Sequence, residues 1–315
     1  MTTKFWKRCL WILLILFVLC NLVVYNHAYR FTHFSETETE RPKKPEELNF
    51  QEKLSALCKG VSVPKPKNHM APAIPYETFY IQSHKKLEGW EVAVENSKGV
   101  VVLFHGYISC KANTLPYSNA FNEKGYSTVL IDFMGHGGSE GVETTIGFKE
   151  GLDVKAAFDY VKEKYPDQKI ILHGSSMGAV AIMKSIEQYD IKPDKIILEC
   201  PFGSMLETAK GRFEIMGLPN TPLAHWLILF GGWQTGFDAF DHNPTDYAQD
   251  ITVPTLLLNG AKDTRVSRDE IDAIYQNVAG EKKLGIMDNS AHQIYLTNDA
   301  PIWNRLVDDF LNSAH

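Results

Sequence analysis

The chain has 315 residues, of which 44% are hydrophobic and 22% charged, enough for one large domain or two small ones with a sizeable core. Residues 1–30 carry four basic side chains and no acidic one, so the rest of the chain holds 28 Lys and Arg against 38 Asp and Glu, near −10. This acidic balance argues against nucleic acid and against binding anionic lipid through a basic surface, and it favours a neutral or apolar substrate.

The N-terminal segment from residue 9 to 25, CLWILLILFVLCNLVVY, is almost entirely apolar. As a helix it would be roughly 25 Å long, within the range of a membrane span. A cleaved signal peptide is the alternative, but the residues after the run offer only Ala28 as a small residue for a cleavage site. We therefore predict an uncleaved anchor over residues 1–30. Three basic residues before the run place the N-terminus in the cytoplasm and the body on the outer (periplasmic, extracellular or lumenal) side of the membrane.

Residues 31–70 are polar and rich in proline, which predicts a tether with a short helix at about 50–57. From residue 71 onward, short β-branched apolar runs alternate with amphipathic stretches. Apolar runs of this kind indicate strands buried on both faces, so we predict an α/β domain over 71–315 with a mostly parallel eight-stranded sheet flanked by helices. The expected helices are 113–124, 147–164, 177–189, 267–278 and 299–312.

Two glycine-containing turns follow the first core strands. In VVVLFHG, we expect His105 and Gly106 to shape the turn. The run IDFMGHGGSEG is a second turn, in which we interpret His136 as structural. Neither GxGxxG nor a Walker lysine occurs there, and the five cysteines show no CxxC spacing, so the sequence predicts neither a phosphate-binding loop nor a cysteine site for a metal such as zinc.

The pattern HGSSMG at 173–178 contains G-x-S-x-G centred on Ser176, between an expected strand and an expected helix. A serine on such a sharp turn projects its hydroxyl from the sheet edge, so we predict Ser176 as a nucleophile. A glycine-rich turn without chemistry is the structural alternative. An oxyanion at this position would need two backbone N–H donors, for which we expect Met177 and Tyr107.

The alternation of strands and helices stops between residues 201 and 250, a stretch rich in aromatic residues and glycine. It follows the sixth core strand, so it would lie over the carboxyl edge of the sheet, where open α/β folds bind ligands. We predict a small cap over about 202–248 that supplies an apolar pocket, with ordinary packing helices as the alternative.

A serine nucleophile needs a histidine to take its proton and an acid to orient that histidine. Asp263 lies in the loop after the apolar run LLLNG, and His292 lies after the final expected strand, which completes the order serine, acid, histidine. Glu199, at the end of the preceding core strand, is a rival acid, whereas Asp288 is interpreted as a turn residue.

Five motifs together resemble the α/β-hydrolase superfamily, and most closely its branch of serine-aminopeptidase-like hydrolases that includes monoacylglycerol lipases. The motifs are HGY (105–107), DFMGHGGSEG (132–141), GSSMG (174–178), GAKDTRV (260–266) and NSAHQ (289–293). The resemblance covers residues 76–312. It implies the triad Ser176, Asp263 and His292, the oxyanion donors Tyr107 and Met177, and no cofactor. The chain departs from that branch at Met134, where arginine is usual, and in the cap.

The expected reaction is hydrolysis of an ester through an acyl-enzyme on Ser176, with a small neutral or apolar acyl substrate and the lipid bilayer as partners. Amide hydrolysis by a serine peptidase, acyl transfer to an alcohol or amine, and a catalytically silent binding module on the same fold are the alternatives.

Overall fold

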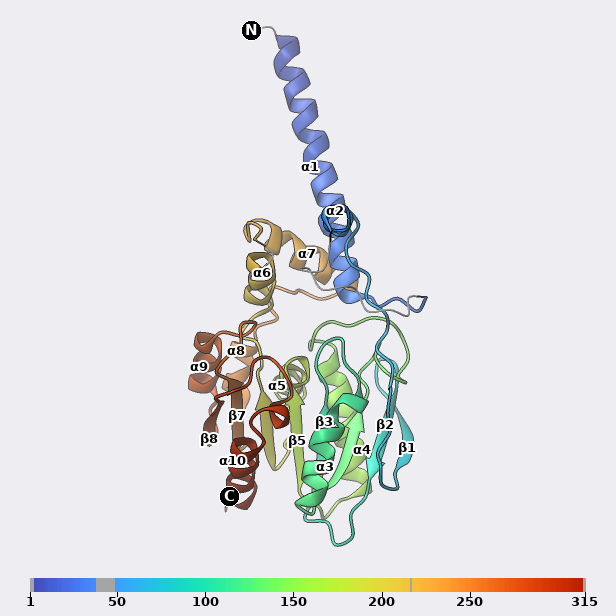
Figure 1. Cartoon of the computed structure of the whole chain (residues 1–315), viewed down its shortest axis with the longest axis vertical. Coiled ribbons are helices and arrows are strands. Elements are labelled where there is room, and N and C mark those ends of the chain that lie inside the picture. The colour runs from blue at the N-terminus through green and yellow to red at the C-terminus, as the bar shows by residue number, and fades with distance from the viewer. Residues whose placement is uncertain (1–2, 38–48, 216, 314–315) are drawn as a thin grey trace. The chain divides into compact units, whose positions relative to one another are not determined.

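The computed structural model describes residues 3–37, 49–215 and 217–313 (Figure 1). The chain divides into two compact units, one formed by residues 1–64 and 209–241 and the other by residues 65–208 and 242–315. The second unit contains the sheet and all five motifs, and we call it the hydrolase unit after the resemblance that those motifs carry. The first contains the N-terminal helix and most of the predicted cap, and we call it the anchor unit after the anchor predicted from the sequence.

The hydrolase unit is built on one eight-stranded sheet with the order β1-β2-β4-β3-β5-β6-β7-β8. Strand β2 pairs antiparallel with β1 on one side and with β4 on the other. Every other neighbouring pair is parallel, as predicted for a mostly parallel sheet. The strands are β1 (Glu77–Gln82), β2 (Lys86–Val92), β3 (Val100–Phe104), β4 (Ser127–Ile131), β5 (Ile170–Ser175), β6 (Lys195–Glu199), β7 (Thr255–Gly260) and β8 (Lys282–Met287).

Helices cover both faces of this sheet (Figure 1). Side chains of α3 and α10 share one core cluster with alternate residues of β3 to β7, among them Leu103, Ile171 and Leu256. Because successive strand residues point to opposite faces, the remaining strand residues face the other side, where α4 and α5 pack together. The helices are η2 (Lys111–Thr114), α3 (Leu115–Glu123), α4 (Glu150–Lys164), α5 (Met177–Tyr189), α8 (Pro244–Tyr247), η3 (Ala248–Asp250), α9 (Arg268–Asn277), η4 (Tyr295–Thr297) and α10 (Ala300–Asn312).

Sequence explains why the sheet is buried on both faces. All five residues of β3, of β4 and of β6 are buried, and most of them are β-branched or aliphatic, although β6 also buries Lys195 and Glu199 at its two ends. Such strands cannot face water on either side, so helices must flank them. In this unit, α9 begins at a reciprocal capping box formed by Ser267 and Glu270.

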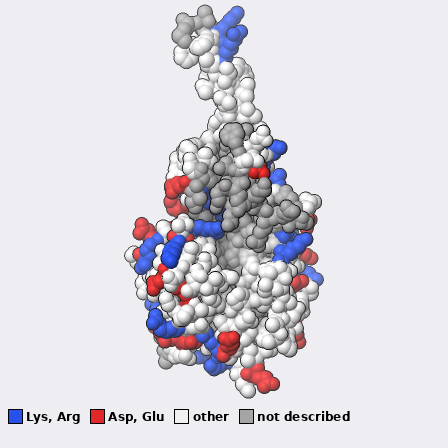
Figure 2. Space-filling model, in the orientation of Figure 1, with Lys and Arg blue, Asp and Glu red and all other residues white. Residues whose placement is uncertain are grey.

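The anchor unit consists of helices. They are α1 (Thr3–Thr32), α2 (Phe50–Lys59), α6 (Met205–Ile215, which enters this unit from residue 209) and α7 (Leu223–Thr235). Helix α1 is long and apolar enough to cross a membrane, the single such helix in the described part of the chain. Basic residues gather at its N-terminal end (Figure 2). The short helix predicted in the tether is confirmed as α2, which Asn49 caps, whereas residues 38–48 of the tether lie outside the described residues.

Candidate active site

Ser176 lies on the tight turn between β5 and α5, with φ 52° and ψ −113°. A non-glycine residue in this region of backbone conformation is strained and persists only where its surroundings hold it. Glycines on both sides allow the turn. A Cβ on Gly178 would lie 2.4 Å from the carbonyl oxygen of Phe104, and one on Gly174 would lie 2.5 Å from the backbone of Gly178. Only glycine therefore lets β5, α5 and β3 approach closely enough to present Ser176.

The structure brings Ser176, His292 and Asp263 into one chain of hydrogen bonds, although 116 residues separate the first two in sequence. The Ser176 hydroxyl lies 3.0 Å from Nε2 of His292, and Nδ1 of His292 lies 2.8 Å from Oδ2 of Asp263. A carboxylate only accepts, so Nδ1 must carry the proton and Nε2 is left to accept from the serine. This arrangement can move a proton from the hydroxyl to the imidazole.

Asp263 is fixed by the loop in which it lies. Its Oδ1 accepts hydrogen bonds from the backbone N–H groups of Arg265 (2.8 Å) and Val266 (3.1 Å), which leaves Oδ2 for His292. Burial by itself would raise the pKa of Asp263, but the hydrogen bond and charge of His292, together with these backbone donors, lower it. Asp263 is thus an ionised, oriented partner for the imidazole.

Burial by itself would lower the pKa of His292, but Cys200 and Asp263 beside it raise that pKa above its ordinary value. The sulfur of Cys200, a carboxylate oxygen of Asp263 and a ring nitrogen of His292 all lie within 4.8 Å of one another. Sequence reasoning missed Cys200. Its signal was available, because it directly follows the core strand that ends at Glu199, and the carboxyl ends of neighbouring parallel strands meet at one sheet edge.

Glu199, the rival acid, has other partners. Trp303 Nε1 donates to it at 2.7 Å, His173 Nε2 donates at 3.0 Å, and the Tyr117 hydroxyl also donates. The Glu199 carboxylate is completely buried beneath the turn that carries Ser176. The backbone carbonyl of Glu199 accepts a hydrogen bond from the Ser176 N–H at 2.7 Å. His292 is therefore bonded to Asp263, and Glu199 ties α3, β5 and α10 together under the turn.

The loop that carries Tyr107 lies beside the nucleophile. A Cβ on Gly106 would lie 3.6 Å from the Cβ of Ser176, so the loop backbone approaches the serine closely. Met177 is the first residue of α5, directly after the nucleophile. Both predicted oxyanion donors thus lie on segments that border Ser176.

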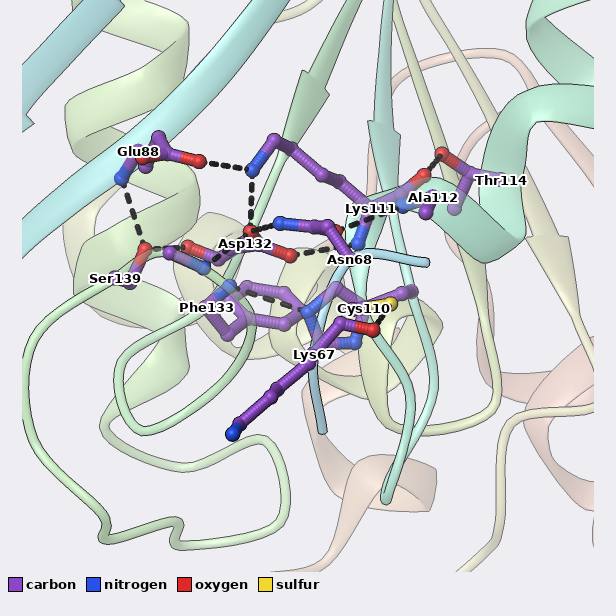
Figure 3. A network of polar contacts seen from close by, with 12 residues as sticks. Lys67, Asn68, Glu88, Cys110, Lys111, Ala112, Thr114, Asp132, Phe133 and Ser139 are labelled. Atoms are coloured by element: carbon purple, nitrogen blue, oxygen red, sulfur yellow. Dashed lines mark hydrogen bonds and ion pairs between the residues drawn. The ribbon is translucent and has the colours of Figure 1, made fainter. Parts of the chain in front are cut away.

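Buried charges hold this loop in place (Figure 3). The Lys111 ammonium is completely buried, pairs with Asp132, and lies 2.7 Å from Glu88. Asp132 also accepts from the backbone N–H groups of Lys111 (2.6 Å) and Gly138 (2.8 Å), so it joins the loop after β3 to the loop after β4. Burial would raise the pKa of Asp132, but Lys111 lowers it. Sequence reasoning did not identify Lys111, because a lysine after a strand is usually solvated.

His105 and His136 are both completely buried. His105 Nε2 accepts from the Phe133 N–H at 3.2 Å, and burial lowers its pKa to about 3. His136 Nδ1 lies 2.9 Å from the carbonyl oxygen of Met134. His105 therefore joins its own loop to the loop after β4, and His136 is hydrogen-bonded within that second loop. Both are buried structural residues, which agrees with their interpretation from the sequence.

Comparisons with known proteins agree with this architecture. A family model described as serine aminopeptidase S33 matches residues 95–229, and one described as PhoPQ-activated pathogenicity-related protein matches residues 240–311. The esterase Pf2001 of Pyrococcus furiosus is similar in structure, with a TM-score of 0.66 and 24% identity over 79% of this chain and 96% of that one. The chain belongs to the α/β-hydrolase superfamily. It is a hydrolase.

Relatives of this hydrolase share much of its length. An uncharacterized protein of Bacillus subtilis, YqkD, is 25% identical over 73% of this chain and 76% of its own. Lysophosphatidylserine lipase ABHD12 of Danio rerio is 23% identical over 73% of this chain, and the match spans 63% of that relative's length. An uncharacterized membrane protein of Saccharomyces cerevisiae, YNL320W, is 24% identical over 78% of this chain and 84% of its own.

Proposed function

We propose that this hydrolase cleaves an ester through an acyl-enzyme on Ser176. The observation that carries the proposal is His292, whose two ring nitrogens lie within hydrogen-bond distance of Ser176 and Asp263. Similarity to a lysophosphatidylserine lipase and to an esterase supports an ester, and supports a lipid-like acyl substrate.

The reaction would begin when His292 Nε2 takes the hydroxyl proton as Ser176 Oγ attacks the ester carbonyl carbon. The negative charge that develops on the carbonyl oxygen would be bound by the backbone N–H groups of Met177 and Tyr107. His292 then returns the proton to the leaving alcohol, and the C–O bond to it breaks. Water, deprotonated by His292, attacks the acyl-enzyme in the same way and releases the acid and free Ser176. Asp263 stabilises the imidazolium in both halves of the reaction.

We also propose that α1 anchors the hydrolase in a membrane, with residues 1–30 as the anchor, 31–70 as the tether and 71–315 as the hydrolase domain, including a cap at about 202–248. Lys4, Lys7 and Arg8 precede the apolar run, so the N-terminus would stay in the cytoplasm and the hydrolase domain would lie on the other side. The apolar length of α1 and the similarity to a yeast membrane protein support the anchor.

The first prediction concerns the nucleophile. A fluorophosphonate probe reacts with an activated serine, so we expect it to label the full chain and not the Ser176→Ala variant. Ester hydrolysis by that variant should fall by about 10⁴-fold or more, because no other hydroxyl would take its place. Labelling on a gel and hydrolysis of p-nitrophenyl esters check the two expectations.

Ser175 supplies the matched control, because it is the adjacent serine and its hydroxyl donates to Glu199 at 3.4 Å. Ser175→Ala should keep the label. Equal labelling of wild type and Ser176→Ala, or none of either, would contradict the proposal. A parallel panel of monoacylglycerols, lysophospholipids and aminoacyl amides separates ester from amide hydrolysis, since the family model that matches residues 95–229 is described as an aminopeptidase.

A further inference from the structure

Helix α7 has an unusual surface for a helix of a globular domain. No Asp, Glu, Lys or Arg occurs between Glu214 and Asp238, a stretch that includes all of α7. Two of its large apolar side chains are exposed, Leu229 at 51% and Trp233 at 73%. A surface helix normally turns polar residues outward and buries its apolar side. In α7 the outward side chains are apolar as well.

Helix α7 packs against α1 within the anchor unit (Figure 1). The rings of Trp226 and Phe17 meet edge to face with centroids 5.9 Å apart. The ring of Tyr25 meets those of Phe230 at 5.6 Å and Trp233 at 6.0 Å. These contacts attach α7 to the stretch of α1 between Phe17 and Tyr25.

Helical geometry gives the depth of that stretch. Arg8 is the last charged residue before the apolar run of α1. Phe17 follows it by about 13 Å and Tyr25 by about 25 Å along the helix axis, whereas the hydrocarbon core of a bilayer is about 30 Å thick. If Arg8 stays at one membrane surface, Phe17 lies near the bilayer centre and Tyr25 near the opposite surface. The partners of these two residues on α7 must then lie in the same leaflet.

We infer that α7 is a second membrane-bound helix, immersed in the leaflet nearer to the C-terminal end of α1. The occupant of its exposed face is the lipid bilayer, and the inference rests on the proposed role of α1 as the anchor. At 13 residues, about 20 Å, α7 is too short to span the membrane and lies within one leaflet beside α1.

The polar and aromatic ends of α7 fit this position. Trp233 and Tyr25 lie together where the apolar run of α1 ends, and such residues are enriched at membrane–water interfaces. Gln234 Nε2 donates to the Tyr25 carbonyl oxygen at 2.8 Å, and the Thr235 hydroxyl donates to the Gly231 carbonyl oxygen at 2.6 Å, so these two donors are satisfied inside the unit, whereas Gln234 Oε1 is buried without a hydrogen-bond partner among the described residues. The first charged residue after α7, Asp238, would be back in water.

The inference gives the cap insertion a role in the membrane. The chain leaves the hydrolase unit at residue 209 and returns to it at residue 242. The two segments of chain at which residues 209–241 leave and rejoin the hydrolase unit would each connect the bilayer to that unit. The segment that follows α1 would be a third connection. The enzyme would then be attached to the membrane through three segments of chain, whereas an N-terminal anchor alone supplies one.

The test measures the depth of single positions in the full chain, reconstituted in phosphatidylcholine vesicles. The parent carries Cys58→Ser, which removes an exposed cysteine. Leu229→Cys and Trp233→Cys are each labelled with an environment-sensitive NBD fluorophore, and quenching by lipids with nitroxides on their acyl chains is recorded after subtraction of the labelled parent. Leu13→Cys, on the exposed surface of α1, reports the anchor, and Asp238→Cys is the matched aqueous position in the same unit.

We expect positions 229 and 233 to be quenched several-fold more strongly than position 238, at a level comparable to position 13. Quenching at 13 but not at 229 and 233 would overturn the inference and leave the anchor intact. Absence of quenching at 13 would show that the anchor itself fails, and the inference with it. If neither lipid nitroxides nor aqueous iodide quench the fluorophore at positions 229 and 233, then protein, such as a second copy of the chain, covers α7 in place of lipid. That result would also overturn the inference.

Discussion

At the scale of single residues, His292 determines the response to pH. The imidazole acts as a base only when neutral, and its pKa is raised because Cys200 and Asp263 outweigh the effect of burial. A group with a raised pKa keeps its proton to higher pH. The neutral fraction of His292, and with it kcat/KM, should therefore increase as the pH rises through the pKa of His292. We expect the rising limb of the profile to have its midpoint above 6.5, the ordinary pKa of histidine.

The Cys200→Ser variant tests the cause of this shift. Removal of the sulfur should move the midpoint of the rising limb to lower pH while the maximal kcat changes little, because Asp263 still orients His292. Cys58→Ser, which changes an exposed cysteine in the anchor unit, is the matched control and should leave the profile unchanged. A Cys200→Ser profile identical to that of wild type would assign the whole shift to Asp263.

The same residues show what sequence can predict about a site. Asp263 and His292 follow strands in the order that the fold uses, and the structure places them at one sheet edge with Ser176. Cys200 and Lys111 carry no motif, and their importance comes from which segments meet around them. Cys200 even has a positive φ of 43°, a backbone conformation that no local sequence pattern announces for cysteine.

At the scale of elements, the turn between β5 and α5 is tightly constrained by its neighbours. Gly178→Ala would place a Cβ 2.4 Å from the Phe104 carbonyl oxygen, an atom of β3 that cannot rotate away. We expect the variant to lose about 1–3 kcal/mol of stability through overpacking. Fluorophosphonate labelling should slow by about 10²-fold, because Ser176 is displaced from His292. Thermal melts and labelling rates measure both effects.

Gly211 on α6 is the matched control for that substitution. A Cβ there would meet no heavy atom within 4 Å, so Gly211→Ala should be neutral or gain about 0.5–1 kcal/mol from the better helix propensity of alanine. Equal labelling rates for Gly178→Ala and wild type would mean that the close approach of β3 and α5 is not needed to present the serine.

Most elements follow from hydrophobic pattern, and the differences have local physical causes. The helix expected at 147–164 begins instead at Glu150, because the Glu150 carboxylate accepts from the backbone N–H groups of Thr145 (2.9 Å) and Gly147 (3.0 Å) and holds the preceding residues in a turn. The association of α1 with α7 was not predictable. Both helices are apolar, and nothing in either one specifies a partner some 200 residues away.

At the scale of the whole molecule, net charge should act on substrate choice. The chain after residue 30 carries about ten more acidic than basic side chains, and Figure 2 shows both signs spread over the visible face of the hydrolase unit. This field repels an anionic substrate and has no effect on the approach of a neutral one. Screening shortens its range from about 30 Å at 0.01 M salt to about 8 Å at 0.15 M.

We therefore expect kcat/KM for an anionic lysophospholipid to rise with salt over that range, by at most about 10-fold, because the repulsion is screened. The value for a neutral monoacylglycerol in the same phosphatidylcholine vesicles should stay constant, which controls for effects of salt on the enzyme and the membrane. The opposite slope, a rate on the anionic substrate that falls with salt, would mean that basic side chains near the site attract the headgroup strongly enough to override the charge of the whole body. In that case recognition of an anionic lipid would be a property of the site, as the name of the lysophosphatidylserine lipase relative suggests for that protein.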